Sequence, residues 1–332
     1  MDSLRDYLSV KSVDMRSTLC IAPSTFTELI KKIEIDSENK GKGMTKDILA
    51  SDVRRILESK GYSYSSSTKI LAFSICKGGV GKSTSSLYIS QRLSAYGAKV
   101  LVIDSDPQGN LTAAFNLESY DFSIDEETPV LIDLVTGDAS LEETIVKFTP
   151  NLHIIPSTPL NSTLDSKIRD KFKNPSVPIA KILRPILGAY DYIIIDCAPT
   201  LNLVNTSIAC ASDLVILPVA PDKFSNIGLN QTLSELDTIE RDFNITIKRK
   251  IVFTKFDARE HTSIKYLGDI AKEQSSIMFK TMIRTASDVK NAITKKEYLF
   301  DYKKSNARED YDNLAREIMG LDKFFSRKIS VQ

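Results

Sequence analysis

One segment constrains the fold of this chain more than any other. An apolar run, Ile70–Cys76, leads into the glycine-rich sequence Lys77-Gly-Gly-Val-Gly-Lys-Ser-Thr84, and an amphipathic stretch, Ser83–Tyr96, follows. The glycines can adopt backbone conformations that point successive N–H groups inward. A helix that begins at the end of such a loop adds its positive N-terminal end to the same anion site. Strand, loop and helix in this order therefore predict a phosphate-binding loop.

The loop departs from the general P-loop pattern, G-x-x-x-x-G-K-[ST]. Counted back from Lys82, the first glycine of that pattern falls on Cys76, and a further lysine, Lys77, follows it. Lys82 stands where a P-loop lysine bridges the β- and γ-phosphates, and the hydroxyl of Ser83 can ligate Mg²⁺. Thr84 can reach the α-phosphate. The segment is therefore expected to hold a nucleoside triphosphate together with Mg²⁺.

After residue 69, short apolar runs alternate with longer amphipathic stretches. Several runs are apolar at nearly every position, as expected of strands covered on both faces. The alternation predicts an α/β fold, with a mostly parallel, twisted sheet flanked by helices and right-handed crossovers. The predicted strands are Ile70–Cys76, Lys99–Ile103, Leu152–Ile155, Tyr192–Asp196, Leu214–Val219, Lys250–Thr254 and Phe279–Ile283, with helices such as Leu201–Ala211 and Ile227–Asp242 between them.

Two further segments place carboxylates at the ends of apolar strands. Val102-Ile-Asp-Ser-Asp-Pro-Gln-Gly-Asn110 carries Asp104 and Asp106, and Asp191-Tyr-Ile-Ile-Ile-Asp-Cys-Ala-Pro199 carries Asp196. Because the carboxyl ends of parallel strands meet at one edge of a sheet, these side chains are expected beside the phosphate loop. A carboxylate in that place is suited to holding Mg²⁺.

These segments resemble the motifs of a known family. The sequence from Lys77 to Thr84 is similar to the deviant Walker A box, KGGxGK[ST], of the ParA/MinD branch of P-loop ATPases. The segment that contains Asp104 and Asp106 resembles the Asp-x-Asp-Pro-Gln-Gly-Asn motif of ParA proteins within that branch. The likeness extends from about Ile70 to Ile318. It implies ATP as the nucleotide.

The resemblance also assigns roles to single residues. It implies that Lys77 reaches across a homodimer to the partner's phosphates, so that the catalytic set is Lys77, Lys82 and Asp106. Asp106 would orient the attacking water, Asp104 would support the region around Lys82 and Mg²⁺, and Asp196 would hold Mg²⁺ through water. The last segment departs from the family in one place, because Ala198 stands where members often have proline.

The predicted nucleotide contacts extend beyond the loop. Phe253-Thr-Lys-Phe-Asp257 matches ParA proteins in position and superficially resembles a guanine-reading box of GTPases. Residue 254 is threonine, and the preceding motifs are those of ATPases, so adenine is the expected base. The metal ligands expected are Ser83 and Asp196, and the expected nucleotide contacts are Lys77, Gly78, Gly79, Gly81, Lys82, Ser83, Thr84, Asp104 and Thr254.

In function, the resemblance implies an ATP-dependent dimer that binds DNA non-specifically and segregates a plasmid or chromosome. A centromere-bound ParB-type protein would stimulate hydrolysis and release. Arg284 and Lys290 lie in the mildly basic C-terminal part, where ParA proteins carry DNA-contacting residues. The alternative for each lysine of this part is an ordinary solvated helix face.

Residues 1–66 are expected to form a small helical unit, and residues 67–332 the ATPase domain. A serine-rich stretch, Gly61–Thr68, marks the boundary, and helix-like patterns at Thr25–Ile33 and Lys46–Lys60 precede it. The resemblance to operon-regulating ParA proteins implies a helix-turn-helix that binds operator DNA and represses the operon, with Arg54 and Arg55 as its contacts. The alternative is an accessory helical hairpin that supports the dimer.

Composition excludes other classes. The net charge of +1 gives no sign of a nucleic-acid-binding chain as a whole, and the four cysteines lack metal-ligand spacing. No signal peptide and no apolar run of about 20 residues is found, so a cytoplasmic protein is expected, and the resemblance to ParA proteins implies that it is associated with the nucleoid.

Three rival hypotheses remain. A MinD-like membrane-cycling ATPase would use the amphipathic stretch Leu314–Ile329. A reductase like the nitrogenase iron protein would need cysteines that bridge a dimer through a cluster. A DNA-binding protein with an inactive ATP site would have lost residues that this chain retains.

Overall fold

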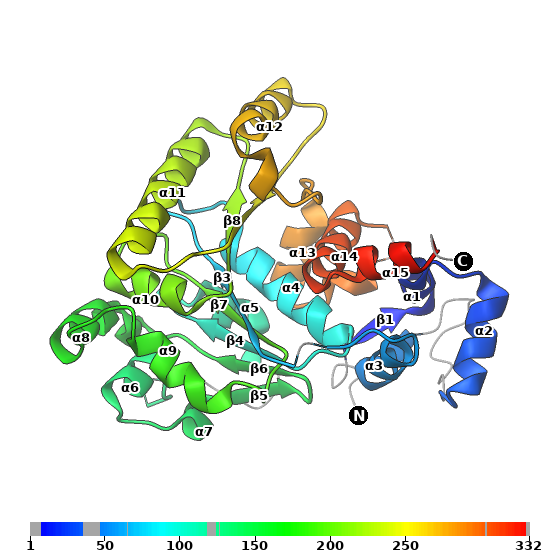
Figure 1. The fold of residues 1–332 in the computed structure, drawn as a ribbon, viewed down its shortest axis with the longest axis horizontal. Helices are drawn as coiled ribbons and strands as arrows, with labels where there is room; N and C mark the ends of the chain where they lie inside the picture. Colours follow the sequence, from blue (N-terminus) through cyan, green and yellow to red (C-terminus); the bar gives the residue numbers. More distant parts are fainter. Residues whose placement is uncertain are drawn as a thin grey trace.

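The computed structural model describes residues 8–35, 47–64, 66–117, 124–125, 127–302 and 304–329. Within these ranges the chain forms a seven-stranded sheet between two layers of helices (Figure 1). All pairs are parallel except that between the two strands at one edge. In order across the sheet, the strands are β5 (Val146–Thr149), β6 (Leu152–Ile155), β4 (Val100–Asp104), β7 (Tyr192–Asp196), β3 (Lys69–Phe73), β8 (Leu214–Val219) and β9 (Arg249–Phe253).

Successive side chains of the strands feed two different cores. Leu71 and Phe73 of β3 belong to one buried cluster, whereas Ile70 and Ala72 belong to the other. This alternation is what a strand buried on both faces requires. The predicted α/β fold is therefore confirmed.

The first cluster is covered by helices from the phosphate loop and the C-terminal part of the chain. They are α4 (Lys82–Ala95), α5 (Asn110–Phe115), α13 (Ser287–Lys295), η5 (Leu299–Asp301), α14 (Asn306–Met319) and α15 (Leu321–Ile329). The second cluster is covered by α6 (Leu131–Thr136), α8 (Leu164–Lys171), α9 (Pro178–Leu183), α10 (Leu203–Ala211), α11 (Lys223–Phe243) and α12 (His261–Gln274). The short elements α7 (Leu141–Thr144), η2 (Pro159–Thr163), η3 (Arg184–Ile186) and η4 (Ser275–Ile277) lie between the longer elements along the chain.

One predicted strand is wrong. The segment Phe279–Ile283 is not a strand, and isolated bridges form only at its two flanks, between Met278 and Ile251 and between Arg284 and Phe256. The N–H of Phe279 donates to the carbonyl of Ile251, and that of Ile283 donates to Phe253. The apolar pattern marked an extended segment, but it did not show that this segment makes too few backbone hydrogen bonds to form a strand. The antiparallel edge strand β5 was not predicted at all.

The N-terminal part consists of β1 (Ser9–Lys11), α1 (Ser12–Leu19), α2 (Pro23–Lys32), β2 (Asp47–Leu49) and α3 (Ala50–Ser59). The strands β1 and β2 pair antiparallel. The helix predicted at Lys46–Lys60 therefore begins only at Ala50, because residues 47–49 form β2; Lys46 lies outside the described residues. Figure 1 shows this part beside the C-terminal helices α14 and α15.

The N-terminal part has no hydrophobic core of its own within the described residues. Met15 and Leu19 of α1 and Phe26 of α2 lie in the same buried cluster as Leu93 of α4 and Phe325 of α15. The division at residue 66 therefore stays a prediction, and the shared core argues against treating the two parts as independent.

The serine-rich stretch before β3 is anchored by two tyrosines. The hydroxyl of Tyr62 donates to the carbonyl of Met319 at 3.0 Å, and that of Tyr64 donates to the carbonyl of Tyr96 at 2.5 Å. Both tyrosine side chains are buried. This stretch ties the two parts of the chain together more firmly than its composition suggests.

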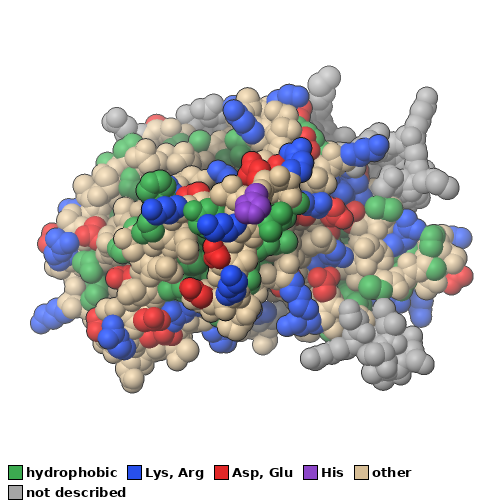
Figure 2. Space-filling view, turned by 90° about the horizontal axis from the view of Figure 1, so that it is seen from above, with side chains coloured by type: hydrophobic (Ala, Val, Ile, Leu, Met, Phe, Trp, Pro, Cys, Tyr) green, Lys and Arg blue, Asp and Glu red, His purple; other side chains and the backbone are tan. Residues whose placement is uncertain are grey.

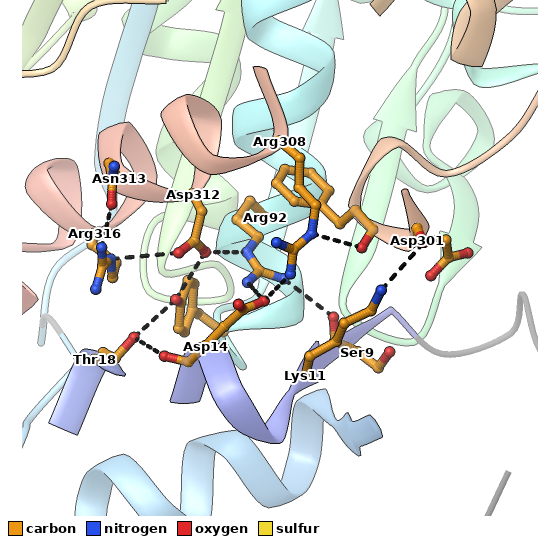
Figure 3. A network of polar contacts seen from close by, with 12 residues as sticks. Ser9, Lys11, Asp14, Thr18, Arg92, Asp301, Arg308, Asp312, Asn313 and Arg316 are labelled. Carbon is orange, nitrogen blue, oxygen red and sulfur yellow. Dashed lines mark hydrogen bonds and ion pairs between the residues drawn. The ribbon is translucent and has the colours of Figure 1, made fainter. Parts of the chain in front are cut away.

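A network of buried charges joins the same elements (Figure 3). Arg92 of α4, whose side chain is 1% exposed, pairs with Asp312 of α14 at 2.5 Å and with Asp14 of α1 at 3.2 Å. Asp14 also pairs with Arg308 of α14. The network fixes α1 against the helix that begins at the phosphate loop.

Candidate active site

The glycine-rich loop connects β3 to α4 with the backbone that a phosphate cradle needs. Gly79 and Gly81 have φ values of 75° and 91°, which side-chain-bearing residues rarely adopt. A Cβ placed on Gly78, Gly79 or Gly81 would meet no atom within 4 Å. The outer side of the loop is thus open to a group that approaches the backbone closely.

The two lysine side chains of the loop make different contacts. Lys82 is buried, and its Nζ donates to the carbonyl of Lys77 at 2.8 Å. Burial lowers the pKa of Lys82, and the negative charge of Asp196 opposes that shift. The Nζ of Lys77 lies 5.5 Å from the ring centroid of Phe224 in α11, a side chain that is 67% exposed.

The beginning of the loop packs tightly against α11. A Cβ on Gly228 would lie 3.0 Å from both the carbonyl oxygen of Cys76 and the Cβ of Lys77. The N–H of Cys76 donates to the hydroxyl of Thr232, one turn further along α11. A glycine at position 228 is therefore needed for this close approach.

The far side of the loop is held by residues that follow β9. The hydroxyl of Thr254 donates to the carbonyl of Val80 at 2.8 Å, and the Nζ of Lys255 donates to that of Gly79 at 2.6 Å. Lys255 has a φ of 52°. Thr254, predicted as a nucleotide contact, is thus buried beneath the loop. Lys255 lies in the same motif but was not predicted as a site residue, because the motif does not show that its side chain reaches the carbonyl of Gly79.

Asp104 and Asp196 lie side by side at the ends of β4 and β7, in register across the two strands. Both are fully buried, and burial raises the pKa of each carboxyl. For Asp196, the neighbouring Asp104 raises the pKa further. Asp104 is stabilised by Thr112, whose N–H and hydroxyl both donate to its Oδ2.

The surroundings of Asp196 fit a magnesium ion. Its Oδ1 accepts a hydrogen bond from Ser86 at 3.0 Å, while its buried Oδ2 has no hydrogen-bond partner in the described part of the chain. The hydroxyl of Ser83 acts on the same carboxyl and helps to hold its pKa down. Carboxylate and hydroxyl oxygens are the hard ligands that Mg²⁺ prefers. Among the described residues there is no group of three or more His, Cys, Asp or Glu side chains that could hold a metal ion by themselves.

Asp106 lies in the loop that follows β4, on the same edge of the sheet. It is 7% exposed, and its Oδ1 accepts the N–H of Gln108 at 3.0 Å. Its own N–H donates to Asp104. The structure therefore brings together the loop lysines and the three predicted carboxylates at one edge, as the parallel sheet requires.

The two residues of the C-terminal part that are predicted to contact DNA differ in their surroundings. Arg284 is held by Asp310, which accepts from its Nε and Nη2 at distances down to 2.6 Å, and its Nη2 also pairs with Glu309. The hydrogen bonds to Asp310 raise the pKa of Arg284. Lys290 of α13 is exposed. Most of the charge of Arg284 is thus balanced within the chain.

Both N-terminal arginines make contacts within the chain. Arg54 of α3 pairs with Asp191 at 2.8 Å, donates to the carbonyl of Gly97 and stacks 3.9 Å from the ring centroid of Tyr64. Arg55 pairs with Asp52 and donates to the carbonyl of Ile33. Their DNA contacts stay predictions that these internal bonds weaken, above all for Arg54.

The four cysteines are free thiols, and Cys197 is buried in the strand-end core beside Asp196. The C-terminal stretch that a membrane-cycling protein would use is docked through Leu321 and Phe325 of α15. Within the described ranges no helix has both the length and the apolar character needed to cross a membrane.

Known proteins resemble this chain in sequence and in fold. The sequence model of the AAA domain family matches residues 68–251. The sporulation initiation inhibitor protein Soj of Bacillus subtilis (strain 168) is 30% identical over 254 residues, which cover 75% of this chain and 98% of that protein. A virulence plasmid ParA family protein of Chlamydia psittaci is 31% identical over 270 residues, or 80% of this chain and 98% of that protein.

Solved structures share the fold. A protein from Borrelia burgdorferi B31 assigned to plasmid partition, solved with AMPPNP, superposes with a TM-score of 0.65 at 25% identity. The superposition covers 77% of this chain and 99% of that one. These comparisons leave between a fifth and a quarter of this chain unmatched.

Proposed function

Because the chain belongs to the ParA family of P-loop ATPases, we propose that it hydrolyses ATP with Mg²⁺ to drive the partition of a plasmid or chromosome. The observation that carries the proposal is the convergence of Lys77, Lys82 and Asp106 on one edge of the sheet. The protein would act in the bacterial cytoplasm, on the nucleoid, together with a centromere-binding ParB-type protein.

In this proposal each residue at the edge has one task. The loop N–H groups and Lys82 bind the phosphates, and Asp106 orients the attacking water. Ser83 and Asp196 would hold Mg²⁺, which neutralises charge that develops on the phosphate oxygens. Asp104 keeps the end of β4 in place through Thr112. Such catalysis consists mainly of positioning and electrostatic stabilisation.

We further propose that ATP joins two copies of the chain through Lys77. The side chain is only half-buried, and the exposed Phe224 next to it offers an apolar surface that an isologous partner can cover. ATP binding would then favour the dimer, and hydrolysis would release it.

The test of this proposal is ATP turnover, measured alone, with DNA and with the ParB-type partner. Lys82→Ala and Asp106→Ala should abolish turnover, whereas Lys147→Ala, an exposed lysine on β5, should not. In sedimentation with ATP, Asp106→Ala should dimerise and Asp106→Ala/Lys77→Ala should remain monomeric. Absence of hydrolysis under every condition would contradict the proposed ATPase activity. ATP-dependent sedimentation with liposomes would favour the MinD-like alternative.

The dimer is proposed to bind DNA without sequence preference through basic side chains that include Lys290 and Arg284. On the face seen in Figure 2, Lys and Arg side chains are spread among acidic ones rather than gathered in one block. Phosphate contacts of this kind weaken steeply with salt. Lys290→Ala and Arg284→Ala should each lower the affinity for random-sequence DNA in the presence of ATP. Unchanged binding at low salt would show that the substituted residue does not contact DNA.

The N-terminal part is proposed to bind operator DNA and repress the operon, but through α2 instead of α3. Three residues, 20–22, join α1 to α2, a spacing found in helix-turn-helix units. Phe26 is the buried anchor of α2, and its exposed surface carries Ser24, Thr25, Thr27, Glu28, Lys31 and Lys32. In such units the second helix enters the major groove.

Fluorescence anisotropy with the DNA upstream of the protein's own gene tests this element. Lys31→Ala/Lys32→Ala should weaken operator binding while ATP turnover is retained. Lys147→Ala again serves as the control. If the double variant binds the operator like the wild type, α2 is not the reading helix.

A further inference from the structure

The loop that carries Asp106 is fastened from the neighbouring strand. The residues after β6 contribute Ser157, whose hydroxyl donates to the main-chain carbonyl of Asp106 at 2.6 Å. The N–H of Ser157 donates to the hydroxyl of Thr112 at 2.9 Å, and Thr112 in turn donates to Asp104. One serine thus holds the main chain of Asp106 directly and the carboxylate of Asp104 through one hydroxyl.

A second residue fixes the serine. The Nδ2 of Asn161, in η2, donates to the hydroxyl oxygen of Ser157 at 2.9 Å. The Oδ1 of Asn161 accepts the N–H of Ile132, at the start of α6, at 3.1 Å. Because the hydroxyl of Ser157 receives a hydrogen bond from Asn161, its own hydrogen is directed to Asp106. The chain of contacts therefore runs from α6 to the catalytic loop.

All members of this chain are shielded from solvent. Ser157 is 4% exposed, Asn161 3% and Thr112 6%. Polar groups buried to this degree are costly unless each is paired, and a paired network holds its members in one geometry. The turn itself has little freedom, since Gly109 has a φ of 61° and a Cβ there would lie 3.3 Å from the carbonyl of Ser157.

We propose that Ser157 and Asn161 are positioning residues for ATP hydrolysis, which hold the main chain of Asp106 so that its carboxylate faces the attacking water. This inference rests on the role proposed for Asp106. In the described part of the chain, the side chains of Ser157 and Asn161 make no hydrogen bond to the glycine-rich loop, so nucleotide binding does not need them. Their loss acts on the catalytic step alone.

The test separates kcat from nucleotide affinity. Ser157→Ala and Asn161→Ala should each lower kcat about tenfold, since small displacements of catalytic groups have effects of that order or larger. The Kd of a fluorescent ATP analogue should stay within about twofold, because the phosphate contacts are unchanged. Ser166→Ala, an exposed serine on α8, is the matched control and should leave both values unchanged.

A double-mutant cycle gives the sharper result. If Asn161 acts through Ser157, the double variant should be no slower than Ser157→Ala alone. Additive losses, an unchanged kcat in Ser157→Ala, or a parallel loss of nucleotide affinity would each overturn the inference. Asp106→Ala is measured in the same assay. Normal turnover in Asp106→Ala would refute the role proposed for Asp106 itself. An inactive Asp106→Ala together with a fully active Ser157→Ala would refute only the positioning role of Ser157.

Discussion

Removal of Asp312 should destabilise the whole chain rather than one helix. Arg92 is buried, and Asp312 accepts from its Nε at 2.5 Å and from the hydroxyl of Tyr96 at 2.9 Å (Figure 3). Asp312→Ala leaves the guanidinium with Asp14 at 3.2 Å as its remaining carboxylate. Breaking a buried pair from one side costs about 3–5 kcal/mol, and the second partner places this case near 3 kcal/mol.

That free energy translates into a measurable shift of the melting temperature. The unfolding entropy of about 2.1 cal/mol/K per residue gives about 0.7 kcal/mol/K for 332 residues. A loss of about 3 kcal/mol should therefore lower Tm by about 4 °C. Thermal unfolding followed by circular dichroism, with denaturant unfolding as a second probe, measures it.

Asp322→Ala supplies the control for this prediction. Asp322 lies 3.8 Å from Arg316, in the same region, but its side chain is 52% exposed. An exposed pair contributes about 0–1 kcal/mol, so its Tm should change by about 1 °C or less. If Asp312→Ala melts like Asp322→Ala, the buried network does not stabilise the contact between α1, α4 and α14, and the reasoning is refuted.

Three other substitutions test the site. Gly228→Ala should weaken nucleotide binding several-fold, because a Cβ there lies 3.0 Å from the carbonyl of Cys76; calorimetry with ATP checks this, and unchanged affinity would contradict it. Lys255→Met removes the hydrogen bond to the carbonyl of Gly79 and should raise KM for ATP while Tm is unchanged. A normal KM would show that this hydrogen bond does not support nucleotide binding. Asp196→Asn should raise the Mg²⁺ concentration needed for half-maximal turnover, and an unaltered Mg²⁺ dependence would remove this carboxylate from the metal site.

The sequence predicted the elements that local patterns determine. Strands β6, β7 and β8 have the predicted bounds, because each is a largely apolar run whose side chains feed the cores on both faces of the sheet. The edge strand β5 was missed, since Val146–Thr149 is partly exposed and its run is interrupted by Lys147. Phe279–Ile283 reads like a strand but pairs at isolated points only. Edge positions depend on neighbours that a single sequence does not show.

The same limit applies to the site. The residues from Lys77 to Thr84 were identifiable because a phosphate loop constrains consecutive positions. Gly228, Lys255 and Ser157 support the site from elements up to 176 residues away in the sequence, and no spacing rule connects them to it. Arg54 shows the same limit from another side. A basic residue on a helix suggested a DNA contact, which stays a prediction, and the sequence did not show that its guanidinium pairs with Asp191.

The shared core also decides how the N-terminal part can be tested. A deletion up to residue 66 would remove Met15 and Leu19 from the cluster that covers α4, and Asp14 from Arg92. Loss of ATP turnover in such a truncated chain would then reflect unfolding of the ATPase, whatever the part binds. Substitutions on the exposed side of α2 avoid this difficulty, since Phe26 alone anchors that helix among the fully buried side chains and can be left in place. Lys31→Ala/Lys32→Ala thus separates operator binding from stability, and truncation does not.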